Sequence, residues 1–155
     1  MVQKEETHLT NDLFFAEVKK LVDEGKSVRM RVRGGSMLPF IRNNDVVRLI
    51  PASQGKIRKG TVVVAQTDEL GYVMHRIIQI EGERFTLLGD GNVNRFEHTD
   101  RSRILAVATH YERGGHTFAT ESFPMRLISY IWYTMHPWRK DFLNRVWKLK
   151  TKLFN

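Results

Sequence analysis

The chain has 155 residues and no cysteine, and its 25 lysines and arginines outnumber its 17 aspartates and glutamates, which gives a formal net charge of +8. This length fits one domain with a buried core. The absence of cysteine excludes a disulfide framework, a cysteine nucleophile and a thiolate metal site. Apolar residues make up 41% of the chain, which excludes a wholly disordered protein. The positive charge points to an acidic partner or to a merely soluble basic surface.

The N-terminal segment predicts a short helix and no membrane span. Residues 1–10 are polar and contain no apolar run like that of a secretory signal. No stretch of the chain reaches the roughly 18 consecutive apolar residues of a spanning helix. We therefore expect a cytoplasmic or peripheral membrane protein. Thr10 or Asn11 can cap a helix that runs to about Glu24, where Gly25 stops it.

The central part of the chain predicts a mainly β domain. Residues 27–33 alternate apolar and cationic side chains, so Val28, Met30 and Val32 are expected to point inward and the arginines outward. Continuous or alternating β-branched runs and glycine turns indicate further strands. These are expected at residues 46–50, 61–66, 71–82, 84–88, 103–111 and 116–119.

A glycine-flanked serine follows the first expected strand. Gly34 and Gly35 precede Ser36, and glycine allows backbone or substrate to approach the hydroxyl closely. Pro39 restricts its own φ and disfavours a helix at the residue before it. A rigid serine on such a loop is how proteins display a nucleophile. The alternative is a turn between two strands that has no chemical role.

The sequence around this serine resembles the signature of the type I signal peptidases. Asn44 stands where that family usually has glycine. The residues that match are Gly34, Ser36, Met37, Pro39, Ile41, Asp45 and Val47. The resemblance implies the α+β, mainly β fold shared by signal peptidases and LexA-type proteases, with a short N-terminal helix and C-terminal amphipathic helices. It also implies that Gly34, Gly35, Met37 and Pro39 form the substrate and oxyanion loop.

A histidine on a later strand can serve as the base. His75 shares one face of its strand with Val73 and Ile77, and imidazole titrates near neutral pH. A packed core histidine is the alternative. This segment resembles the V-x-H-R box of the endoplasmic-reticulum-type and archaeal signal peptidases, which use histidine where most bacterial enzymes use lysine. The resemblance implies a pair of Ser36 and His75, with the histidine acting first as general base and then as general acid.

An Asp-Gly segment follows the hairpin. Residues 87–92 are similar to the G-D-N-N box of the same family, with Gly91 in place of the first asparagine. Asp90 would then accept a hydrogen bond from His75 and fix its tautomer; a simple Asp-Gly turn is the alternative. The histidine-type enzymes carry another aspartate shortly afterwards. Here the corresponding positions hold Arg95 and Phe96, and Glu97 and Asp100 could substitute only at a different spacing, so a second acid is not expected from the family pattern.

The oxyanion hole is only partly specified, and no cofactor or metal is expected. The family pattern makes the backbone N–H of Ser36 one donor. Many relatives add a hydroxyl two residues earlier, where this chain has Gly34, so a second donor must be backbone or water. The remaining histidines lack the spacing of metal ligands. They are His8, His98, His110, His116 and His136.

The C-terminal part is basic and aromatic. Residues 121–155 hold seven lysines and arginines against two acids. Pro124 can open a helix, and a second helix can follow Pro137. Aromatic residues among cations on an amphipathic helix are typical of an anchor on an anionic membrane. A packed helix pair with a solvated basic face, or a contact with a partner protein or substrate, is the alternative; nucleic acid is disfavoured because no recognition motif is present.

These features predict a catalytic domain at residues 1–120 and a helical extension at residues 121–155. The expected function is that of a serine endopeptidase, which cleaves a peptide or a leader of a precursor protein through Ser36, His75 and an acyl-enzyme, with Asp90 in support. The resemblance implies small residues before the scissile bond. Two alternatives stay open. One is an inactive peptide-binding module of the same fold, and the other is a LexA-like self-cleaving regulator.

Overall fold

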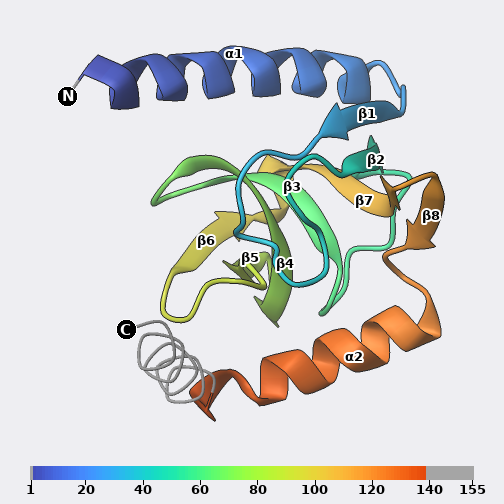
Figure 1. The fold of residues 1–155 in the computed structure, drawn as a ribbon. Coiled ribbons are helices and arrows are strands. Elements are labelled where there is room, and N and C mark those ends of the chain that lie inside the picture. Colours follow the sequence, from blue (N-terminus) through green and yellow to red (C-terminus); the bar gives the residue numbers. More distant parts are fainter. Residues whose placement is uncertain (1, 139–155) are drawn as a thin grey trace, which may run out of the picture.

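The computed structural model describes residues 2–138, with side chains from Leu13 onward. Within residues 2–138 the chain forms an eight-stranded antiparallel sheet with a helix on either side (Figure 1). The elements are α1 (Val2–Asp23), β1 (Val28–Arg31), β2 (Val46–Pro51), β3 (Val62–Thr67), β4 (Gly71–Glu81), β5 (Arg84–Leu88), β6 (Phe96–Asp100), a 3₁₀ turn (Arg101–Arg103), β7 (Ile104–Arg113), β8 (His116–Ala119) and α2 (Phe123–Thr134).

The sheet is curled into a half-barrel, and the prediction of a mainly β fold is confirmed. Its strands follow the order β1-β2-β7-β3-β4-β5-β6, and β8 pairs with β7. The strand β7, late in the chain, therefore lies between the early strands β2 and β3. Because β7 pairs with both β2 and β3, the loop between β1 and β2 and the β4–β5–β6 meander belong to one sheet.

Helix α1 ends where predicted but begins earlier. Gly25 has φ +77°, and its N–H donates to the Val22 carbonyl while the Lys26 N–H donates to the Leu21 carbonyl, both at 3.0 Å. These two bonds satisfy the last carbonyls of the helix. The expected start at residue 10 or 11 is wrong, because the polar segment before it contains neither proline nor glycine and continues the helix to Val2.

Two clusters of apolar side chains form the core. The first lies between α1 and the strands β1, β2 and β7, where Phe15, Val18 and Val22 of the helix pack onto the sheet. The second lies on the other face of the sheet. It consists of Val63, Ala65, Val73, Ile77, Phe85, Leu87, Ile104 and Val107. The inward positions predicted for Met30 and Val32 of the first strand segment are confirmed.

Most strands lie where the sequence predicts them, but β6 was not predicted. The segment Phe96–Asp100 contains charged and polar residues in place of the usual apolar alternation. Glu97 and Thr99 are nevertheless the buried residues of this strand. A carboxylate in an inward position hides the period-2 pattern on which strand prediction depends.

Helix α2 begins at Phe123 with a proline in its first turn, as predicted. The second helix expected after Pro137 lies outside the described residues, and the boundary between residues 120 and 121 stays a prediction. No helix in the described part of the chain combines the length and the hydropathy needed to cross a bilayer.

The C-terminal cap of α1 gives a stability prediction. Replacing Gly25 by alanine should lower the free energy of unfolding by about 1 kcal/mol, because an alanine at φ +77° is strained although space is available for its Cβ. Gly25→Asn is the matched control and should lose less, because asparagine tolerates the left-handed region. Urea denaturation of both variants measures the difference. Equal losses would contradict the backbone explanation.

Candidate active site

The loop between β1 and β2 presents Ser36 to solvent and is anchored in the core by residues that follow it. Ser36 is exposed, whereas Met37 and Ile41 are buried in the first core cluster. The Leu38 N–H donates to the Gly35 carbonyl, and the Ile41 N–H donates to the Met37 carbonyl. The buried methionine and isoleucine thus hold a short turn on which the hydroxyl is displayed. The Leu38–Pro39 peptide bond in this turn is cis.

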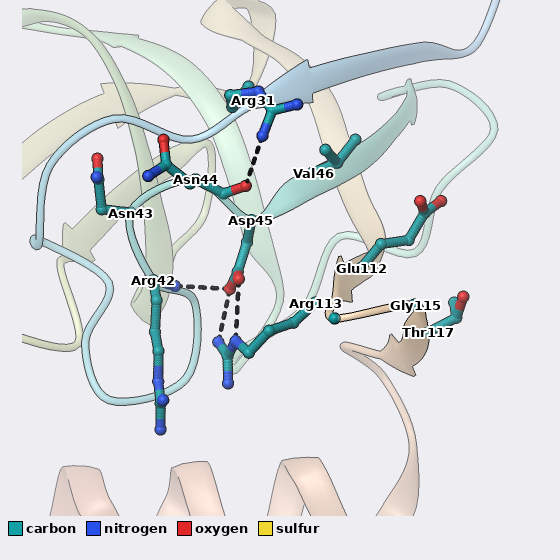
Figure 2. A pocket seen from close by; sticks show the side chains of 11 residues that line it. Arg31, Arg42, Asn43, Asn44, Asp45, Val46, Glu112, Arg113, Gly115 and Thr117 are labelled. Carbon is teal, nitrogen blue, oxygen red and sulfur yellow. Dashed lines mark hydrogen bonds and ion pairs between the residues drawn. The ribbon is translucent and has the colours of Figure 1, made fainter.

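A buried aspartate closes the base of the serine loop (Figure 2). Both oxygens of the Asp45 carboxylate accept hydrogen bonds from Arg113, at 2.9 and 2.6 Å, and one also accepts from the Arg42 N–H at 2.8 Å. Arg113 donates further to the Phe40 carbonyl at 2.7 Å. Burial alone would raise the pKa of Asp45, but the bonds from Arg113 and Arg42 outweigh it and hold the pKa below its ordinary value. The acid of the motif is therefore a structural clamp that ties the loop to β7.

The asparagine that replaces glycine in the motif fits the backbone. Asn44 has φ +72°, which is the left-handed region that glycine favours and asparagine tolerates. The loop keeps its shape because the Gly34 N–H donates to the Asn43 side-chain oxygen at 3.0 Å. The departure from the family pattern at this position is thus conformationally conservative.

His75 lies buried on β4, with one ring nitrogen held by a carboxylate. Its face of the strand carries Val73 and Ile77, as predicted, while Met74 belongs to the opposite core cluster. The residue is 4% exposed. Its Nδ1 lies 2.9 Å from an oxygen of Glu97. The ring is therefore fixed in orientation, and its Nε2 is directed away from Glu97.

The serine loop and the imidazole meet at Gly89. A Cβ atom placed on Gly89 would lie 2.5 Å from the Ser36 carbonyl oxygen and 3.0 Å from His75 Nε2. Both atoms thus border the same small space, which remains open because the residue has no side chain. The Gly91 N–H donates to the Ser36 carbonyl at 2.8 Å and fixes the two loops together. The structure brings Ser36 and His75, the predicted pair, into one site.

Glu97 makes the contact that was expected of Asp90. It lies on the unpredicted strand β6, directly opposite Leu87 of β5, and its side chain is fully buried. The pairing of β5 with β4 begins at Leu88 opposite Arg76, so β5 places no side chain beside His75. The glutamate can therefore reach across to the imidazole. Its second oxygen has no hydrogen-bond partner among the described residues.

Asp90 forms a buried ion pair with the next residue of β4. The Arg76 guanidinium donates to both Asp90 oxygens, at 2.7 and 2.6 Å, and also to the Gly60 carbonyl. Because neighbouring residues of a strand point to opposite faces, Arg76 and His75 face different carboxylates. The carbonyl of Asp90 accepts a hydrogen bond from Trp132 of α2 at 2.7 Å. Asp90 thus fixes the loop that carries Gly89 and Gly91.

Comparison with known proteins agrees with this architecture. A model of the Peptidase S24-like family matches residues 3–107, which is more than half of the chain. The chain belongs to the Peptidase S24-like family. Searches of curated proteins and of solved structures gave no match. The family match covers every residue of the Ser36–His75–Glu97 arrangement, whereas Arg113 and Trp132 lie beyond it.

In this S24-like site, one backbone N–H of the serine loop makes no hydrogen bond to another described residue. The Ser36 N–H has no acceptor within the part of the chain that the structure describes. Gly34 has φ +91° and no atom lies within 4 Å of the position that its Cβ would take. Because glycine has no side chain, residue 34 supplies no side-chain donor. Asn92 is the last residue of the G-D-N-N-like box. Its side-chain amide nitrogen would lie 2.7 Å from a Cβ atom placed on Gly89, so it borders the same space.

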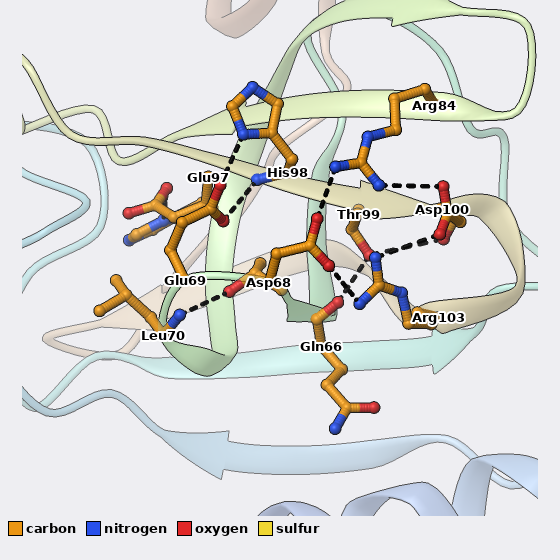
Figure 3. Close-up of polar contacts among 12 residues, drawn as sticks. Gln66, Asp68, Glu69, Leu70, Arg84, Glu97, His98, Thr99, Asp100 and Arg103 are labelled. Atoms are coloured by element: carbon orange, nitrogen blue, oxygen red, sulfur yellow. Dashed lines mark hydrogen bonds and ion pairs between the residues drawn. The ribbon is translucent and has the colours of Figure 1, made fainter.

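A network of ion pairs holds the strand that carries Glu97 (Figure 3). Glu69 accepts hydrogen bonds from the His98 backbone at 2.8 Å and pairs with its ring at 2.6 Å. The Thr99 hydroxyl donates to the Gln66 carbonyl at 2.6 Å. These contacts join the two residues of β6 that follow Glu97 to the end of β3 and to the turn between β3 and β4. The register of β6, and with it the position of the buried carboxylate, is thereby fixed.

No candidate metal centre was found within residues 2–138. Among the described residues, no three histidine, aspartate or glutamate side chains converge as metal ligands would. The arrangement instead offers an exposed hydroxyl, an oriented imidazole and a buried carboxylate. Chemically this suits nucleophilic attack assisted by a general base.

The clamp at Asp45 predicts a pH-dependent contribution to stability. Replacing Arg113 by methionine should cost about 2–3 kcal/mol near neutral pH, because it leaves a buried carboxylate with fewer partners. The folded pKa of Asp45 lies below its ordinary 3.8. The stabilisation is therefore complete above about pH 4 and is lost as the pH falls through the folded pKa.

Urea denaturation between pH 3 and pH 7 tests this expectation. The difference in unfolding free energy between wild type and Arg113→Met should shrink toward the acid end. Arg29→Met is the matched control, because Arg29 pairs with Glu112 on the exposed surface and its loss should cost less than about 1 kcal/mol. A difference that stays constant with pH would argue against the clamp.

Proposed function

We propose that this S24-like protein is a serine endopeptidase that cleaves a peptide or the leader of a precursor protein through Ser36, His75 and Glu97. The observation that carries the proposal is the meeting at Gly89. There the Ser36 backbone and His75 Nε2 border one space, while Nδ1 of the same ring is held by Glu97. A nucleophile, a base and an orienting acid in this order form a catalytic triad.

The proposed reaction starts with attack of the Ser36 hydroxyl oxygen on the substrate carbonyl. His75 Nε2 takes the hydroxyl proton, and Glu97 stabilises the resulting imidazolium through Nδ1. The Ser36 N–H donates to the oxyanion. Collapse of the tetrahedral intermediate breaks the peptide bond, and His75 returns the proton to the leaving amine. Water then hydrolyses the acyl-enzyme with the same histidine as base.

An inactive peptide-binding module of the same fold is the second candidate. The observation in its favour is Gly34, which leaves the oxyanion hole without a side-chain donor. Loss of one such donor costs on the order of 10²–10³ in rate. The two functions differ in whether the Ser36 hydroxyl can be acylated.

Acylation of Ser36 is therefore the first test. A fluorophosphonate probe should label the wild-type protein, and labelling should vanish in Ser36→Ala and fall at least about 100-fold in His75→Gln. Mass spectrometry of the labelled peptide locates the adduct. Glu112→Gln, an exposed change on β7, is the control and should be labelled at the wild-type rate. Wild-type protein that is folded but never labelled, and that cleaves no member of a peptide library, would leave only the binding function.

The role of the acid gives a second, independent prediction. Glu97→Gln should lower kcat by about 100-fold or more with little change in KM, because the neutral amide cannot stabilise the imidazolium. Asp90→Asn should act mainly on stability, because it breaks a buried ion pair with Arg76. Peptide hydrolysis and urea denaturation measured together separate the two effects. If Asp90→Asn lost activity at full stability while Glu97→Gln kept it, the acid would have been misassigned.

A further inference from the structure

Helix α2 turns an uncharged apolar face toward solvent. Phe123 is 78% exposed, Ile128 53% and Trp138, just beyond the helix, 76%. The exposed large residues of this region are Phe123, Leu127, Ile128, Tyr130, Ile131, Met135 and Trp138. The one charged residue of α2 is Arg126, which pairs with Glu121. An apolar surface of this extent marks an interaction site rather than ordinary solvent-facing surface.

The spacing shows that this is one continuous stripe. Phe123, Leu127, Ile131 and Met135 recur at every fourth position and so lie above one another on the helix. The opposite side of the helix carries the groups that touch the protein, including buried Ser129 and the partly buried Trp132. The outward face of α2 is therefore apolar, whereas a surface helix normally buries its apolar stripe and exposes polar residues.

The charge of the chain after α2 indicates what covers the stripe. Residues 139–155 contain six lysines and arginines and one aspartate. A second copy seated on the stripe would carry the same formal net charge of +8, so repulsion between the two chains would oppose its approach. An anionic bilayer complements the charge, accepts the apolar side chains and suits Tyr130 and Trp138, since aromatic rings favour the headgroup level. Nucleic acid would match the charge but not the apolar stripe.

We propose that the outward face of α2 lies in the interface of an anionic membrane, with the helix parallel to the surface. At 1.5 Å per residue, twelve residues extend only about 18 Å, which is too short to span a bilayer. An apolar face buried to the level of the acyl boundary, with cations held near the headgroups, is the geometry of an interfacial helix.

This docking would place the candidate active site beside the membrane. On its inward side, Trp132 donates to the Asp90 carbonyl at 2.7 Å and packs edge-on against Phe40 of the serine loop. Figure 1 shows α2 across one side of the sheet, with α1 on the other. This part of the inference rests on the proposed function. It specifies the substrate as a peptide held at or near the bilayer surface.

Vesicle flotation of the full-length protein tests the docking. Wild type should float with vesicles of phosphatidylcholine and phosphatidylglycerol and only weakly with phosphatidylcholine alone. Ile131→Glu should lower partitioning at least about tenfold, because the side chain can no longer be buried. Leu13→Glu is the matched control: Leu13 is an exposed leucine of α1, on the other side of the sheet, and its replacement should leave flotation unchanged.

A label provides a second measurement that does not depend on a charged variant. The chain has no cysteine, so Ile131→Cys and Leu13→Cys each give a single site for a polarity-sensitive fluorophore. Anionic vesicles should shift the emission to the blue at position 131 and not at position 13. Both experiments are repeated on Ser36→Ala, which should bind membranes like wild type, so that failure of the peptidase proposal and failure of the docking remain distinguishable.

Three results would overturn the docking. The first is no flotation of wild type with anionic vesicles at low salt. The second is equal flotation of Ile131→Glu, which would assign binding to the basic segment alone. The third is a concentration-dependent dimer that Ile131→Glu abolishes without any vesicle binding, which would make a second copy the occupant.

Discussion

The candidate site depends on the missing side chain at residue 89. At this point β5 leaves the sheet, the serine loop approaches from the β1–β2 connection, and the imidazole approaches from β4. A single methyl group would overlap the Ser36 carbonyl oxygen at 2.5 Å, which is backbone and cannot move away without shifting the loop. Gly91 is similarly constrained, because its Cβ would lie 2.7 Å from the Gly35 carbonyl oxygen. The two glycines thus allow two loops to pack backbone against backbone, and His75 Nε2 lies beside that contact.

Two adjacent residues of β4, the proposed base His75 and the supporting Arg76, face different carboxylates. His75 faces Glu97 and Arg76 faces Asp90, and all four side chains are nearly or fully buried. Burying a charged group costs desolvation free energy, which is recovered only with good geometry and enough hydrogen bonds to the group. Asp90 meets this condition, because the guanidinium donates to both of its oxygens. Glu97 meets it less completely, since one oxygen has no partner among the described residues. The less satisfied pair is the one that includes the proposed base, as expected where function takes precedence over stability.

The sequence predicts those parts of the site that depend on local chemistry. The loop around Ser36 is readable because glycine, proline and the spaced apolar anchors each have a local conformational meaning, and the face of His75 follows from strand alternation. Glu97 was named only as a substitute for a second acid, because its contact with His75 depends on the register of β6, and the charged composition of that strand hides its pairing. Asp90 has the right residue type and the family spacing, yet Arg76 on the other face of β4 engages its carboxylate. The early start of α1 was missed because a polar segment without breakers signals neither a helix nor its end. Which carboxylate contacts His75 thus depends on the pairing of strands, and the local sequence pattern does not specify that pairing.

Support for the site extends past the part of the chain that the family model matches. That match ends at residue 107, but the clamp on the serine loop uses Arg113 at the end of β7. The carbonyl of Asp90 is held by Trp132 of α2, whose ring also packs on Phe40. A chain that stopped at residue 107 would leave the Asp45 carboxylate without its guanidinium and the Gly89–Gly91 loop without its outer contact. Because both contacts act on the two loops that meet at residue 89, the C-terminal elements are part of the scaffold that keeps Ser36 and His75 together.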